Sequence, residues 1–446
     1  MKLTRLLIAA VVMAGLGGAV MWSNRAEKAK ADKPAPDAGP KILTLKDSDI
    51  RQIEISKKDS DTTVVKKNDS GQWAITAPKP LAADQNAVSG VASAATSLGS
   101  DRVVDEHVSD ADLQSYGLAP ADIKVKFTMA DGKATTLLLG EKTPGGNDVY
   151  AKLEGDPRLF TAASYSSDSF NKGYKDLRDK RMMTFDKDKT SRVELAEAGQ
   201  AAIEFGRIDM NTWQILKPKP TRADSFQVED LLSSAKSSEM SATLSDEDEK
   251  KYVASFGSAP PLTTLTVTDP SGSQKLEVRK SKDDYYAKSS AVEGVQKLQA
   301  DFGKALEKKL DDFRNKKLFD FGFNDPNRVE VKDNGKDVAV DKTGDNWNAA
   351  GKTMDSVSVQ AMIDKIRDLQ ATKFAESGFT TPQVELTVVS DSGKRTEKVQ
   401  IAPLGTNFLA RRDGDATLYQ LDASAVSDLR KAANDVKPAS PANNKK

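Results

Sequence analysis

The chain has 446 residues with 66 Lys or Arg and 66 Asp or Glu, so its formal net charge is zero. A single hydrophobic core rarely grows beyond about 250–300 residues, so this length predicts several domains. The balanced charge argues against nucleic acid as a partner. Because the chain has no cysteine and only one histidine, His107, the sequence excludes disulfides, thiolate nucleophiles and Cys/His zinc sites, and no cofactor is expected.

The N-terminus carries an export signal. Lys2 and Arg5 precede an uncharged apolar stretch at residues 6–22, which as a helix would be about 25 Å long against a hydrocarbon core of about 30 Å. We expect residues 1–25 to be an uncleaved signal anchor, with a cleavable signal peptide as the alternative. An anchor places the protein in the inner membrane, crossed once by residues 6–22, with its body in the periplasm. Cleavage would instead release it into the periplasm.

Two segments have the composition of linkers. Residues 26–40 (AEKAKADKPAPDAGP) are charged and rich in Ala and Pro, which predicts a semi-extended linker. Residues 434–446 have the same character, so we expect a disordered tail. The folded body is therefore predicted between these two segments.

The body contains an internal repeat. Residues 73–84 (WAITAPKPLAAD) and 213–224 (WQILKPKPTRAD) are identical at seven of twelve positions, 140 residues apart. A third and more diverged copy places Trp347 134 residues after Trp213. The sequence therefore predicts three units. They are residues 41–186, 187–322 and 323–433.

Each copy has the same order of elements. Alternating polar and apolar runs, such as residues 52–55 and 63–66, predict half-buried strands. A helix with apolar spacing comes next, and Asp84, Asp224 and Asp355 stand where it would begin. A hairpin with an Asp-Gly or Ser-Gly turn follows, and a charged helix closes the unit. The predicted fold class is α+β: three tandem repeats of an antiparallel sheet with helices packed on one face, after an N-terminal membrane helix.

These motifs resemble a known bacterial family. The resemblance rests on W-x-I-x-x-P-x-x-x-x-A-D at Trp73 and Trp213, on YGLAP at residues 116–120 and on DLRDK at residues 176–180. Over about residues 42–330 the chain is similar to the family known as domain of unknown function 4340. Its members are exported or membrane-anchored envelope proteins, often encoded beside ABC-type export permeases, and no catalytic residues are assigned to them. The resemblance thus implies a location and a partner, and it supplies no reaction.

The recurring tryptophans Trp73, Trp213 and Trp347 have two interpretations. A large aromatic side chain at the same place in each copy is typical of a core position. In an envelope protein the same three side chains could also form an interaction surface that stacks on sugars. We keep both interpretations open at this point.

Acidic side chains are the other candidates. Asp84 and Asp224 could form a catalytic pair, but repetition places them in different units, and N-capping of a helix explains each one locally. The acidic run at residues 245–249 suits a helix N-terminus, because it lacks the glycine and closing glutamate of a calcium loop. We therefore expect no catalytic residue and no metal ligand.

The sequence as a whole predicts a non-enzymatic, membrane-tethered envelope protein that acts as an accessory or interaction subunit. The resemblance points to an ABC-type exporter as its partner. One alternative is a protein that binds the cell wall or a polysaccharide through the tryptophans. Another is a hydrolase with an unrecognised carboxylate pair.

Overall fold

The computed structural model describes residues 41–240, 245–322 and 326–440. The predicted signal anchor at residues 1–25 and the linker at residues 26–40 lie outside this part of the chain. Among the described residues, no helix combines the length and the apolar character needed to cross a bilayer.

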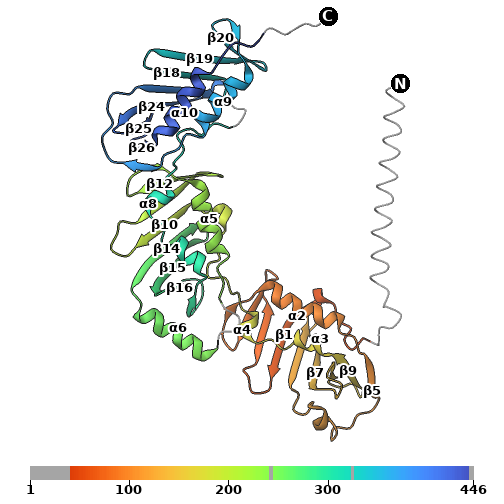
Figure 1. The fold of residues 1–446 in the computed structure, drawn as a ribbon. Coiled ribbons are helices and arrows are strands. Elements are labelled where there is room, and N and C mark those ends of the chain that lie inside the picture. The colour runs from red at the N-terminus through yellow and green to blue at the C-terminus, as the bar shows by residue number, and fades with distance from the viewer. Residues whose placement is uncertain (1–40, 241–244, 323–325, 441–446) are drawn as a thin grey trace, which may run out of the picture. The chain divides into compact units, whose positions relative to one another are not determined.

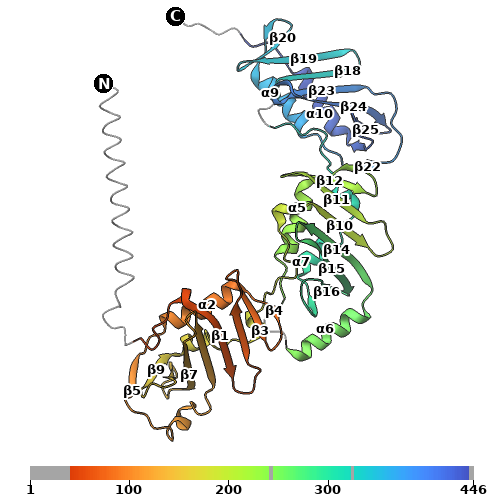
Figure 2. The same cartoon turned by 180° about the vertical axis from the view of Figure 1, so that it is seen from behind.

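The described residues form three antiparallel sheets (Figures 1 and 2). The nine strands of the first sheet are, in spatial order, β4 (Leu81–Ala82), β3 (Trp73–Ala77), β2 (Thr63–Lys67), β1 (Ile50–Lys57), β6 (Ile123–Met129), β7 (Ala134–Lys142), β8 (Asp148–Leu153), β9 (Leu159–Ala163) and β5 (Arg102–Asp105). Its helical segments are η1 (Asp47–Asp49), α2 (Gln85–Ser97), η2 (Leu113–Tyr116), α3 (Ser164–Asp168) and α4 (Tyr174–Leu177).

The second sheet repeats this strand order without the last strand among the described residues. Its strands are β13 (Thr221–Arg222), β12 (Thr212–Lys217), β11 (Ile203–Asp209), β10 (Arg192–Glu197), β14 (Pro261–Asp269), β15 (Gly272–Ser281), β16 (Asp284–Ser289) and β17 (Val295–Lys297). The accompanying helices are η3 (Lys187–Lys189), α5 (Ser225–Lys236), α6 (Asp246–Ser258), α7 (Ala300–Ala305) and α8 (Leu310–Phe313).

The third sheet again has nine strands within the described residues. They are β21 (Lys352–Thr353), β20 (Asn346–Ala349), β19 (Lys336–Thr343), β18 (Arg328–Asp333), β23 (Val384–Ser390), β24 (Arg395–Leu404), β25 (Asn407–Arg412), β26 (Leu418–Leu421) and β22 (Lys373–Ala375). Its helical segments are α9 (Ser356–Arg367), η4 (Asp391–Gly393) and α10 (Ala423–Asn434). The predicted α+β class with three antiparallel repeats is confirmed.

One helix of each copy begins where the sequence predicts. The Asp84 carboxylate accepts hydrogen bonds from the backbone N–H groups of Asn86 and Ala87, which satisfies donors that the first turn of α2 leaves free. Asp224 caps α5 and Asp355 caps α9 in the same way. The inner face of each sheet is the face covered by these helices.

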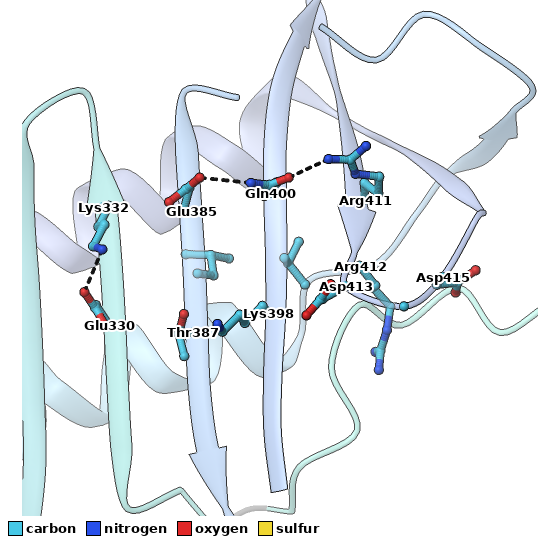
Figure 3. A pocket seen from close by; sticks show the side chains of 13 residues that line it. Glu330, Lys332, Glu385, Thr387, Lys398, Gln400, Arg411, Arg412, Asp413 and Asp415 are labelled. Atoms are coloured by element: carbon cyan, nitrogen blue, oxygen red, sulfur yellow. Dashed lines mark hydrogen bonds and ion pairs between the residues drawn. The ribbon is translucent and has the colours of Figure 1, made fainter. Parts of the chain in front are cut away.

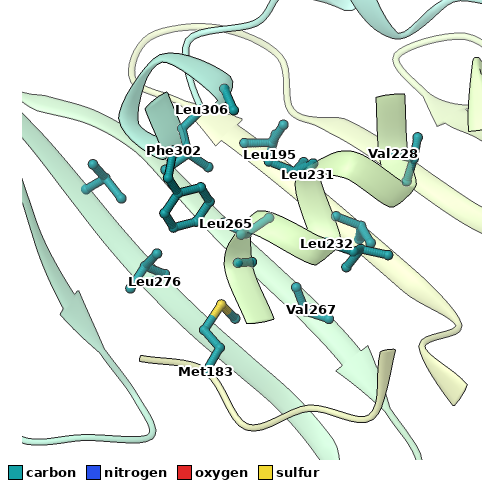
Figure 4. Packing of buried hydrophobic residues seen from close by; sticks show 14 of the residues in the cluster. Met183, Leu195, Val228, Leu231, Leu232, Leu265, Val267, Leu276, Phe302 and Leu306 are labelled. Carbon is teal, nitrogen blue, oxygen red and sulfur yellow. The ribbon is translucent and has the colours of Figure 1, made fainter. Parts of the chain in front are cut away.

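The apolar stripe of each capped helix and the alternate residues of the strands form one core per sheet. In the second sheet, α5 contributes Val228, Leu231 and Leu232, each 0% exposed (Figure 4). Leu265 and Val267 of β14 face them from the sheet. Full burial of one such side chain stabilises a fold by about 1.5–3 kcal/mol, so the pattern of alternation fixes which face turns inward.

The hairpin turns have the geometry that their sequences require. Gly132 between β6 and β7 has φ +83°, and Gly272 between β14 and β15 has φ +124°. L-residues rarely adopt such angles, which explains the Asp-Gly and Ser-Gly pairs.

The second and third units begin earlier than the predicted boundaries at residues 187 and 323. Met182, Met183 and Phe185 are buried in the core of the second sheet. Leu318 and Phe319 are likewise buried in the third core. By its contacts the chain divides between Lys180 and Arg181 into two compact units, of which the second contains two sheets.

Each copy is closed by a short segment that pairs with the strand before its capped helix. The N–H groups of Asp84 and Asp224 donate to the carbonyls of Leu177 and Phe313, each at 2.8 Å. In the third copy the N–H of Asp355 donates to the carbonyl of Lys437, also at 2.8 Å. The prediction of a disordered tail from residue 434 is therefore wrong for residues 434–440, because this segment completes the third unit.

Removal of the closing segment should loosen the third unit. A chain that ends at Asn434 loses both backbone hydrogen bonds between the closing segment and residues 353–355, from Asp355 to Lys437 at 2.8 Å and from Ala439 to Thr353 at 3.0 Å. We expect the free energy of opening of α9 to fall by about 1–3 kcal/mol relative to a chain that ends at Ser440. Amide hydrogen exchange of α9 measures the change, and equal protection in both chains would contradict it.

Candidate interaction surface

The three recurring tryptophans are core residues. Trp73 and Trp347 are 5% exposed and Trp213 is 1% exposed. The indole N–H of Trp213 donates to Glu229 at 2.8 Å, and the Arg207 guanidinium lies 4.5 Å from the ring centroid. The interpretation of Trp73, Trp213 and Trp347 as an interaction surface is wrong, because neither face of a buried ring can stack on a sugar.

Trp213 is held by a small charged network. Lys187 lies 3.1 Å and Arg207 2.9 Å from the carboxylate oxygens of Glu229. Burial by itself raises the pKa of Glu229, but the hydrogen bonds from Trp213 and Lys187 and the charge of Arg207 lower that pKa below its ordinary value. The carboxylate is therefore a structural partner of the indole.

The aspartates of the proposed catalytic pair act as caps. Asp84 and Asp224 direct one carboxylate oxygen each at backbone N–H groups of their own helices. In the part of the chain that the structure describes, no three His, Cys, Asp or Glu side chains gather in a way that could hold a metal ion.

Each sheet also has an outer face, opposite its capped helix. In the first sheet the segment between β5 and β6 lies on this face. Leu113 and Leu118 of that segment pack with Leu159 of β9, and the ring centroid of Tyr116 lies 4.7 Å from that of Tyr150 on β8. The outer face of β7 to β9 is thus covered by apolar contacts from the chain itself.

In the second sheet helix α6 covers the corresponding face. Phe256 of α6 packs with Tyr286 and Val295. Its ring lies 4.6 Å from the Arg279 guanidinium and 4.9 Å from the Lys288 ammonium. The prediction that helices pack on one face is therefore wrong for α6, because its aromatic side chains are buried against the opposite face from α5.

The third sheet has a shorter covering segment, which consists of residues 376–383 between β22 and β23. Beside this segment the outer face forms an open basin of about 780 Å³ (Figure 3). The polar side chains that line it on the strands are Glu330 and Lys332 of β18, Glu385 and Thr387 of β23, and Lys398 and Gln400 of β24. Residues 411–415 form its wall. We name this feature the β18–β25 basin.

A row of hydrogen bonds crosses the floor of the basin. The Gln400 amide donates to Glu385 at 3.0 Å and accepts from Arg411 at 2.8 Å (Figure 3). On the next strand Lys332 lies 3.2 Å from Glu330, and this hydrogen bond and ion pair raise the pKa of Lys332. The floor is therefore made of polar groups whose positions are set by their neighbours.

Two charges in the basin are free of such partners. Lys398 and Asp413 have no ion pair among the described residues, although both line the basin (Figure 3). With Glu385 and Arg411, whose bonds go to an uncharged amide, they leave two positive and two negative groups available to a ligand. A ligand of mixed charge would match this arrangement.

Ion pairs and hydrogen bonds with residues outside the basin hold its wall in position. Arg412 lies 3.3 Å from Glu397 and 3.4 Å from Asp320, which begins the third unit. Asp415 accepts from the N–H of Thr417 at 2.8 Å and from the hydroxyl of Tyr419 at 2.7 Å. These bonds hold residues 411–415 in place.

The same region joins the second sheet to the third. Arg222 of β13 forms an ion pair with Asp320 and donates to the carbonyl of Lys317 at 2.8 Å. The hydroxyls of Thr221 and Thr417 are 2.8 Å apart. The basin wall therefore depends on contacts from two repeats.

The fold defines this molecule as a tandem α+β repeat protein, and its third sheet has an open, polar outer face. The chain belongs to the family described as "Domain of unknown function (DUF4340)", whose sequence profile matches residues 73–212 and 213–387. Each match begins at a recurring tryptophan, and together they confirm the resemblance in the sequence. No curated protein and no solved structure is significantly similar to the chain.

The sequence motifs did not single out the basin residues. Glu385 and Thr387 alternate with buried residues of β23, so their outward direction follows from the period of two. The segment between β22 and β23 is shorter than the segment between β5 and β6, and this difference in length was a second sequence feature that pointed to a less covered face. The basin is recognised only when the outer faces of the three sheets are compared. That comparison requires the strand register, which the motifs do not give.

Replacement of Trp213 tests its core role. Trp213→Ala should lower the free energy of unfolding by about 3–5 kcal/mol, because it leaves a cavity under α5 and removes the partner of Glu229. Phe226→Ala is the matched control, since Phe226 is 74% exposed on the same helix and should change stability by about 0.5 kcal/mol or less. Chemical denaturation measures both, and similar stabilities for the two variants would contradict the assignment.

Tyr419, which donates a hydrogen bond to Asp415 in the basin wall, should ionise only at high pH. Burial and then the hydrogen bond to Asp415, opposed by the charge of Arg222, raise the pKa of Tyr419 to about 12. Because this pKa is above the ordinary value of about 10, the contribution of Tyr419 to stability is complete below about pH 10 and is lost as the pH rises towards 12.

Absorbance at 295 nm should therefore show one phenol that ionises last, and Tyr419→Phe should remove it. The same variant should flatten the fall in stability between about pH 10 and 12. Tyr165→Phe is the control, because Tyr165 is 78% exposed. An unchanged late phase in Tyr419→Phe would show that another tyrosine is responsible.

Proposed function

We propose that this chain is a non-enzymatic envelope protein that is tethered to the inner membrane and acts as an accessory or interaction subunit. Residues 6–22 serve as the anchor, and the three repeats stand in the periplasm. The observation that carries the interaction role is the β18–β25 basin, an open face of about 780 Å³ lined by polar groups in fixed positions. The family resemblance makes an ABC-type export permease the leading partner.

The location rests on the N-terminal sequence. An apolar stretch that follows Lys2 and Arg5 is the form of a signal anchor, and Arg25 and Lys28 follow it on the other side. Cleavage after export would leave the body in the same compartment without its tether.

The residues considered for the two alternative functions have structural roles. A polysaccharide-binding protein would need exposed aromatic side chains, but Trp73, Trp213 and Trp347 are buried. A hydrolase would need another carboxylate pair, because Asp84 and Asp224 cap helices. Neither alternative has a specific observation in its favour.

Alkaline phosphatase fused to the C-terminus tests the location, because this enzyme is active only after export. We expect an active fusion that sediments with membranes and resists extraction at high salt. Deletion of residues 6–22 is the control and should give an inactive fusion in the cytosol. A full-length fusion that is soluble and inactive would disprove the proposed location.

Recovery of a partner tests the function. The tagged full-length chain should bring down a permease from detergent-solubilised membranes after mild crosslinking, and the deletion of residues 6–22 should not. Retention of envelope glycans by the purified chain, with no protein recovered, would favour the polysaccharide alternative instead.

A further inference from the structure

Strand pairing relates the outer faces of the second and third sheets residue by residue. In the second sheet Glu277 lies opposite Lys288, and in the third Gln400 lies opposite Arg411. The pairs Thr266–Lys275 and Thr387–Lys398 correspond in the same way. The two faces can therefore be compared position by position, with the second sheet as an internal reference.

The equivalent cations perform the same task in both sheets. The Lys288 ammonium lies 4.9 Å from the ring of Phe256 in α6. The Arg411 guanidinium lies 4.6 Å from the ring of Phe379 in the short covering segment. A cation–π contact thus holds the covering polypeptide at the same place on each outer face.

The two faces differ in the length of the polypeptide that covers them. Helix α6 has 13 residues and places apolar and aromatic groups on β15 to β17. The third sheet offers only residues 376–383, and its floor carries Glu385, Lys398 and Gln400 beside the cover. The third repeat therefore keeps the device that holds a covering polypeptide but has less polypeptide of its own to cover the face.

We propose that the β18–β25 basin binds a polypeptide segment of the partner protein, a segment that carries side chains of both charge signs. This inference rests on the proposed function and names the surface through which it operates. In the first two copies polypeptide of the chain itself covers the last strands of the outer face, over β7 to β9 and over β15 to β17. Charged groups of the basin that have no ion pair among the described residues match both signs: Lys398 and Arg411 can bind carboxylates, and Glu385 and Asp413 can bind lysine or arginine.

The lining argues against a glycan. None of the described residues that line the basin is aromatic, whereas sugars are usually held against an aromatic ring. A neutral sugar also offers no counter-charge to the four charged groups named above. A polypeptide of mixed charge satisfies them.

Site-specific photocrosslinking in cells tests the proposal with the full-length chain. A photoreactive benzoylphenylalanine replaces Thr387 in the basin, and the control replaces Thr266, its equivalent in the second sheet. We expect one discrete protease-sensitive adduct from position 387, with a yield at least five times that from position 266. Mass spectrometry of the adduct then identifies the partner segment.

Charge reversal provides the second arm. Lys398→Glu should lower the adduct yield about tenfold, whereas Lys275→Glu, at the equivalent position of the second sheet, should leave it unchanged. The mapped segment of the partner should contain an acidic residue that faces Lys398. When that residue is replaced by lysine, the adduct yield of the Lys398→Glu variant should be restored. Circular dichroism and thermal unfolding of each purified variant verify that the fold is intact.

The proposal is overturned by equal yields from positions 387 and 266, by no adduct, or by failure of the charge reversal to matter. An adduct destroyed by glycosidase would show a glycan in the basin, and an adduct of two copies of this chain would show self-association, so either result also overturns it. If a permease is recovered while the basin gives no adduct, the proposed function stands and this inference falls.

Discussion

A β-sheet has two faces, and one layer of helix can cover only one of them. In every copy of this protein the apolar face is covered by a helix that begins at a capping aspartate: Asp84, Asp224 and Asp355. Once that helix is in place, alternation along the strands turns the polar residues to the opposite face. What each copy does with this second face then decides what it can contribute to function.

The three copies cover the outer faces of their sheets differently. The first covers its last strands with a loop that contains Leu113, and the second covers them with helix α6. The third covers Leu409 with residues 376–383 and leaves charged and amide side chains on the floor and wall of a basin beside that cover. Divergence among copies is therefore informative, because it singles out the copy with the shortest covering segment as the one we propose binds a partner.

The structure also shows why the copies follow one another so closely. The closing segment of the first copy, near Leu177, ends just before Arg181, which forms a bridge with Glu239 after α5 of the second copy. In the third copy the closing segment comes from residues around Lys437. In the last two copies Arg222, Asp320 and Arg412 form a joint that also supports the wall of the basin. Architecture and candidate site are thus parts of one arrangement.

The sequence by itself determined the three repeats, their antiparallel strands, the capped helices and the membership of the family, because these features depend on short-range periodicity and on motifs such as the one that begins at Trp73. It left open whether the tryptophans face the core or the solvent, since a large aromatic side chain suits both. Only the tertiary structure decided that question and revealed the basin. Its floor and wall, among them Glu330, Glu385, Gln400 and Arg411, come from four strands spread over about 80 residues. Strand register, which depends on contacts between distant residues, is what brings them together.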